Sequence, residues 1–80
     1  MKRYSANGHT IIQVRGIEFE SDSEVRSWTY AWAGSRLEVG DQFLITIGNR
    51  EWEVVVVAFG TEYEGYIRTI GGKFGLTYGL

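Results

Sequence analysis

The run Trp52-Glu53-Val54-Val55-Val56-Val57-Ala58-Phe59 decides the fold of this chain. It is rich in β-branched and aromatic residues, which favour a strand over a helix. Because the run is apolar on both faces, it is typical of a central strand that is covered on both sides. The turn residues 48–50 (Gly-Asn-Arg) come directly before it. We therefore expect it to form a hairpin with the alternating segment at residues 43–47.

Strand patterns extend along most of the chain. Alternating or β-branched apolar residues recur in five further segments: residues 10–14, 17–20, 28–32, 43–47 and 66–70. The one segment with the composition of a helical turn, residues 21–26, is too short to form a stable helix. The sequence therefore predicts an all-β fold, a small SH3-like or OB-like barrel of five to seven short antiparallel strands with little or no helix.

Length and composition predict one domain. The chain has 80 residues, of which 44% are hydrophobic and 15% aromatic, enough for a dense core without a metal or disulfide bond. We expect residues 1–80 to form a single β-barrel domain. The tail, residues 71–80, mixes glycine with aromatic residues. It is expected either to close the barrel as a last strand or to lie over a pocket.

Composition also argues against several kinds of site. The chain has no Cys and a single His, His9, so we expect no zinc site of the Cys type, no other metal and no cofactor. No apolar run approaches the ~20 residues that span a bilayer. The N-terminus lacks the apolar segment of a signal peptide. We therefore expect a cytoplasmic protein with no membrane partner.

Charge and motif content favour binding over catalysis. The net charge of −2 argues against non-specific binding to duplex DNA, which depends on a basic face. A small ligand, a nucleic-acid end or a protein partner suits this charge better. The sequence offers no Ser-His-Asp arrangement, no paired carboxylates in contrasting environments and no phosphate-binding glycine loop. We therefore expect that the protein is not an enzyme.

Two residues allow both a structural and a functional interpretation. Trp28 shares one face of its strand with Tyr30 and Trp32, so it belongs either to a core stripe or to a surface that stacks on a ligand. Arg68 interrupts an apolar strand. It is either an ordinary surface residue or a guanidinium at a pocket rim, where it can bind phosphate through two hydrogen bonds.

The order of these elements resembles a known family. The residues that carry the resemblance are Trp-Thr-Tyr at 28–30, Leu-Glu-Val-Gly-Asp at 37–41, Ile-Gly-Asn-Arg at 47–50, the valine run at 54–57 and Ile-Arg at 67–68. Over about residues 26–70, the chain is similar to the N-terminal DNA 3′-end-binding domain of the primosomal replication-restart helicase. It is also similar to small stand-alone phage proteins with this pattern. The helicase motor has no counterpart in these residues, so the resemblance implies no ATPase activity.

The resemblance implies a pocket around the terminal nucleotide of a single strand. Trp28 takes the place of the family's aromatic residue, Gly48 that of its hairpin glycine with Asn49 beside it, and Arg68 replaces its lysine. Thr29 stands where the family has an aspartate that binds the 3′ hydroxyl. A threonine hydroxyl can still bond a sugar hydroxyl, but it lacks the charge that strengthens such a bond.

The sequence thus predicts a non-catalytic module that holds a nucleotide, or the terminal nucleotide of single-stranded nucleic acid, in a barrel pocket. A phage protein of this kind would act in counter-defence, by sequestering a nucleotide signal in the host cytoplasm. The alternative is a module for protein–protein interaction or self-association, such as a phage accessory or inhibitor protein. It would use exposed aromatic residues, the tail or an open strand edge.

Overall fold

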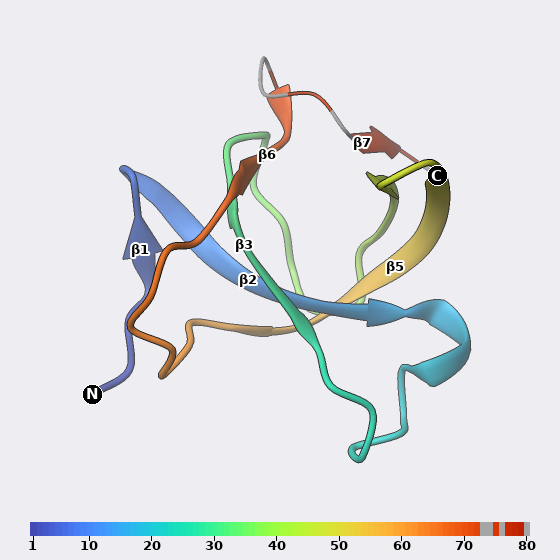
Figure 1. The fold of residues 1–80 in the computed structure, drawn as a ribbon, viewed down its shortest axis with the longest axis horizontal. Helices are drawn as coiled ribbons and strands as arrows, with labels where there is room; N and C mark the ends of the chain where they lie inside the picture. The colour runs from blue at the N-terminus through green and yellow to red at the C-terminus, as the bar shows by residue number, and fades with distance from the viewer. Residues whose placement is uncertain (73–74, 76, 80) are drawn as a thin grey trace.

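One strongly curled sheet forms the molecule, and the fold is all-β as predicted (Figure 1). The computed structural model describes residues 1–72, 75 and 77–79. The strands are β1 (Ser5–Ala6), β2 (His9–Gly16), β3 (Trp28–Trp32), β4 (Gln42–Ile47), β5 (Arg50–Phe59), β6 (Thr69–Ile70) and β7 (Thr77–Gly79). Their order across the sheet is β6-β3-β2-β5-β4-β7, with β1 paired to β2. No ladder joins β6 to β7 within the described residues, so the sheet is a half-barrel.

The valine run lies where its composition predicts. It forms β5, which pairs antiparallel with β2 on one side and with β4 on the other. Val54, Val55 and Val56 have no exposed surface, so both faces of the strand are covered. The predicted hairpin is confirmed: Ile47 pairs with Arg50 across the intervening two-residue turn.

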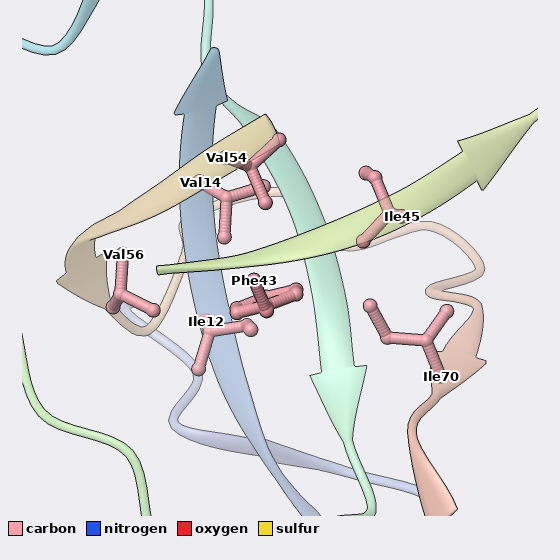
Figure 2. Close-up of a cluster of buried hydrophobic side chains, with 7 residues drawn as sticks. All are labelled: Ile12, Val14, Phe43, Ile45, Val54, Val56 and Ile70. Atoms are coloured by element: carbon pink, nitrogen blue, oxygen red, sulfur yellow. The ribbon is translucent and has the colours of Figure 1, made fainter. Parts of the chain in front are cut away.

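The interior of the half-barrel holds the main hydrophobic core. Four strands contribute its buried side chains: Ile12, Val14, Phe43, Ile45, Val54, Val56 and Ile70 (Figure 2). Larger side chains pack around this cluster, among them Trp28, Tyr30, Trp32 and Trp52. A smaller cluster of Ile11, Ala31 and Ile67 lies on the opposite face. This division follows from the period-two alternation of the strands.

Residues 17–20 do not form the expected strand. Ile17–Phe19 is a short 3-10 helix, η1. The N–H of Glu20 donates to the carbonyl of Ile17 at 3.2 Å, and Asp22 N–H donates to Phe19 O at 3.0 Å. These successive turns redirect the chain from β2 toward β3. Ile17 is half-buried but Phe19 is exposed, so the alternation of residues 17–20 does not mark a strand with one buried face.

The expectation that all strands pair antiparallel is wrong for one pair. β6 runs parallel to β3, with Ala31 opposite Thr69 and Trp32 opposite Ile70. β3 and β5 are both antiparallel to β2, so they point in the same direction. The chain leaves β5, crosses residues 60–68 and enters β6 beside β3 without reversing. Only 69–70 of the expected strand at 66–70 is paired.

The tail adds the last strand of the sheet. Thr77 pairs with Ile45, and Gly79 with Phe43, so β7 extends the sheet beyond β4. Residues 73, 74, 76 and 80, which belong to the predicted tail, lie outside the described residues. Within the described part of the chain, no helix is long and apolar enough to cross a membrane.

Candidate functional site

Three aromatic side chains form a row on the interior side of the sheet. Trp28 and Tyr30 are two residues apart on β3, so they share the face that packs against the core. Trp52 of β5 meets Trp28 edge to face, with ring centroids 5.4 Å apart. All three rings are only partly buried. We call Trp52, Trp28 and Tyr30 the aromatic row.

An arginine lies at each end of the aromatic row. The guanidinium of Arg50 is over the ring of Trp52, 4.0 Å from its centroid, a distance typical of a cation–π contact. At the other end, the N–H of Ala31 donates to the carbonyl of Arg68 at 2.9 Å, which places Arg68 next to Tyr30. Both arginines are exposed. The row therefore combines aromatic rings with two accessible positive charges.

Carboxylates lie close to the Trp52 end of the aromatic row. Glu51 and Glu53 flank Trp52 in the sequence, and successive side chains of a strand point to opposite faces. Both glutamates are exposed, as their spacing predicts. With Glu18 they nevertheless line an open pocket of about 310 Å³ together with Arg50 and Trp52, so this end of the row carries one arginine with three carboxylates nearby.

The structure places the five predicted site residues on β3, in the turn between β4 and β5 and in the segment before β6, and does not bring them together in one pocket. Trp28 belongs to the aromatic row, and Arg68 ends it. Thr29 points to the opposite face of β3, where it is paired with Gln13. Gly48 and Asn49 form the exposed turn beside Arg50, and Gly48 has a φ of 62°.

Two open pockets adjoin these residues. One of about 430 Å³ is lined by both Trp28 and Thr29, together with Gln13 and Tyr63. Arg68 lines the other, of about 520 Å³. Neither pocket is lined by Gly48 or Asn49.

Sequence reasoning undervalued two residues of this site. Arg50 and Trp52 are not among the residues that the sequence predicts to bind a ligand. The signal that links them is alternation: Arg50, Trp52 and Val54 are two residues apart, so they share one face of β5. Because Val54 is buried in the interior core, the other two must lie on the interior side.

A further pocket, of about 490 Å³, lies beneath the loop that joins β3 to β4. Trp32, Leu37 and Phe59 are among its lining residues. The indole N–H of Trp32 donates to the carbonyl of Ser35 at 2.6 Å, which holds the loop against the strand. None of the predicted site residues lines this pocket. Across the described ranges 1–72, 75 and 77–79, no group of three or more His, Asp or Glu residues could hold a metal ion.

The pKa of Tyr30 is sensitive to the positive charge of Arg68. Burial raises the pKa of the Tyr30 phenol above 10, and the positive charge of Arg68 acts in the opposite direction. Replacing Arg68 with glutamine is therefore expected to raise the pKa of Tyr30 further. Alkaline titration of tyrosinate absorbance, corrected with a Tyr30→Phe variant, measures this shift. The exposed Arg36 provides a charge-matched control, since Arg36→Gln should leave the titration unchanged.

The raised pKa of Tyr30 also makes the stability of the protein depend on pH. The pKa of Tyr30 is higher in the folded chain than the value near 10 of an unfolded tyrosine. The protonated phenol therefore makes its full contribution to the free energy of unfolding below about pH 10. This contribution is lost as the pH rises through the folded-state pKa. An Arg68→Gln variant in which Tyr30 titrates as in the parent chain would contradict the effect of the Arg68 charge on Tyr30.

Comparisons of this chain with protein family models, with curated proteins and with solved structures give no significant match. The resemblance to the primosomal helicase domain stays a prediction from the residues quoted above, as do a phage origin and a role in counter-defence.

Proposed function

We propose that this protein is a non-catalytic module that binds a nucleotide, or the terminal nucleotide of single-stranded nucleic acid, at the aromatic row. The observation that carries the proposal is the aromatic row with an arginine at each end. Aromatic faces stack on bases of any sequence, at about 1–3 kcal/mol per base. Guanidinium groups bind phosphate oxygens through paired hydrogen bonds.

The row is prepared for binding by its packing. Trp28 and Trp52 contact each other and rest on the buried core, so their rings are already held in place. Side chains ordered before binding lose little conformational entropy when a ligand arrives. The exposed part of Trp28 is therefore available for stacking at a small entropic cost, whereas the guanidinium of Arg50 already lies over the ring of Trp52.

The open edge of β3 supplies polar groups beside the row. Ala31 and Ala33 donate their N–H groups to the carbonyls of Arg68 and Ile70. Backbone groups of alternate residues point to the same edge of a strand, so those of Thr29 point there too. No strand of the described chain pairs with this edge at Thr29. A nucleotide seated at the edge reaches the ring of Trp28 and the polar groups of Thr29.

The chemistry of the row suits binding rather than catalysis. Its polar members are two arginines and a tyrosine whose pKa is raised above 10. General acid–base catalysis needs a group that exchanges its proton near the working pH. The raised pKa of Tyr30 keeps its phenol protonated near neutral pH, and all three side chains can hold a phosphate or a sugar.

The proposal predicts that Trp28→Ala weakens nucleotide binding. We expect the dissociation constant for thymidine 5′-monophosphate to rise about tenfold or more, since one stacked base contributes about 1–3 kcal/mol. Calorimetric titration measures the affinity. In the parent chain, tryptophan fluorescence should also change on binding.

Arginine variants separate loss of the site from loss of the fold. Arg50 and Arg68 are exposed, so Arg50→Gln and Arg68→Gln should fold normally and still weaken binding by about tenfold each. Arg36→Gln removes the same charge away from the row and should change affinity less than about twofold. Equal effects of all three variants, or no binding to the parent chain, would contradict the proposal.

One observation favours a second candidate, self-association through strand edges. The β3 edge at Thr29 and the outer edge of β7 have no paired strand within the described residues, and such edges can accept a strand from another chain. Light scattering over a wide range of protein concentration tests this. A monomer at all concentrations would exclude self-association.

A further inference from the structure

Tyr66 is a large aromatic residue that is left almost fully in solvent. Its side chain is 81% exposed, although it belongs to the segment that connects β5 to β6. It lines the open pocket of about 520 Å³ together with Arg68, Asn7, His9 and Thr69. Tyr66 and Arg68, a residue with a phenol ring and a residue with a guanidinium, thus line the same open space.

The segment that carries Tyr66 is held on both sides. Before it, the guanidinium Nη1 of Arg3 donates to the carbonyls of Tyr63 and Gly65, at 3.0 and 3.1 Å. After it, the amide of Asn7 donates to the carbonyl of Ile67 at 3.2 Å and to the hydroxyl of Thr69 at 3.1 Å. The backbone around Tyr66 is therefore fixed, which gives this exposed residue a defined place.

Arg68 connects this pocket to the aromatic row. Its carbonyl accepts the N–H of Ala31, so its backbone lies beside Tyr30 at the end of the row. The same residue lines the pocket of Tyr66. A phosphate held by Arg68 would have an aromatic ring on each side, Tyr30 toward the row and Tyr66 toward the pocket.

We infer that Tyr66 and Arg68 form a second nucleotide subsite, and that the ligand is a single strand of at least two nucleotides. The first base stacks on the aromatic row, Arg68 binds the phosphate between the nucleotides, and the second base stacks on Tyr66. This inference rests on the proposed function and narrows its ligand class. Neighbouring aromatic rings and cations are how single-strand binders follow a strand without reading its sequence.

The test compares ligands of increasing length. Affinities for thymidine 5′-monophosphate, its dinucleotide and its tetranucleotide are measured by calorimetry on the full chain. We expect the dinucleotide to bind about tenfold more tightly than the mononucleotide. Tyr66→Ala should remove this gain and leave mononucleotide affinity unchanged, whereas Tyr66→Phe should keep the gain because it keeps the ring.

The test includes a matched control variant, and its outcomes distinguish an error in the second subsite from an error in the proposed function. Tyr4 is also exposed, at 60%, and lies outside the pocket, so Tyr4→Ala should keep the gain. If the dinucleotide binds the parent chain no better than the mononucleotide, or if Tyr66→Ala keeps the gain, the second subsite is wrong and the proposed function stands. If no thymidylate ligand binds the parent chain, the proposed function itself fails and the second subsite fails with it.

Discussion

Replacing Ile12 with alanine is expected to lower the free energy of unfolding by about 2–5 kcal/mol. Ile12 has no exposed surface and lies in the interior core. Its strand, β2, is flanked by β3 and β5, so the surroundings have little freedom to fill the space left behind. Domains of this size have a total stability of roughly 4–12 kcal/mol, so the loss is a large part of it. Urea denaturation followed by circular dichroism measures the change.

Ile47 provides the matched control for Ile12. It is the same residue type, also on a strand of the sheet, but it is 37% exposed at the hairpin end of β4. Ile47→Ala should cost no more than about 1 kcal/mol, mainly through lost strand propensity. Equal losses for the two variants would contradict the assignment of the half-barrel interior as the stabilising core.

Features set by neighbouring residues could be predicted from the sequence. The valine run has one residue type on both faces, and this indicated a strand with neighbours on both sides. The hairpin needed only the two-residue turn at Gly48 and Asn49 between two strand patterns. Period-two alternation was enough to place Trp28, Tyr30 and Trp32 on one face. These predictions depend on local geometry, which the sequence determines directly.

Features set by distant residues could not be predicted in the same way. Whether residues 17–20 form a strand depends on a pairing partner, and the 3-10 turn places them where none is present within the described chain. The parallel pairing of β6 with β3 depends on how the chain crosses from the central strand β5, past β2, to the outer side of β3. Alternation at residues 66–70 indicated that this segment makes apolar contacts, but not whether its strand pairs parallel or antiparallel.

The candidate site includes features of both kinds, some set by neighbouring residues and some set by distant ones. Trp28 and Thr29 are adjacent on one strand, so their opposite faces follow from the sequence alone. The approach of Arg68 to Tyr30 requires the β3–β6 pairing, which connects residues distant in sequence. The contact of Trp28 with Trp52 requires β2 and its two neighbours to curl toward the interior. Sequence reasoning therefore named several residues of the site but could not assemble them.

Replacing Gly60 with alanine is expected to destabilise the protein by about 2–5 kcal/mol, from backbone strain of about 1–2 kcal/mol and crowding of about 1–3 kcal/mol. Gly60 has a φ of +79°, and a Cβ there would lie 2.9 Å from the carbonyl oxygen of Arg3 and from the ring of Tyr4. The site has little room to relax, because Gly60 N–H donates to Ile11 O and its carbonyl accepts from the Gln13 amide. Thermal or urea denaturation measures the loss.

Gly8 separates the two causes of this loss. Its φ is +80°, almost the same as that of Gly60, but a Cβ there would meet no other atom of the described residues within 4 Å. Gly8→Ala should therefore show the backbone strain alone, about 1–2 kcal/mol. The extra loss in Gly60→Ala then measures how tightly the N-terminal segment packs on the end of β5. This packing also includes paired backbone bonds between Arg3 and Thr61, of 2.7 and 2.8 Å. Equal losses in the two variants would mean that the N-terminal segment does not lie against Gly60 in solution. Arg3 would then no longer be placed to hold the segment that carries Tyr66.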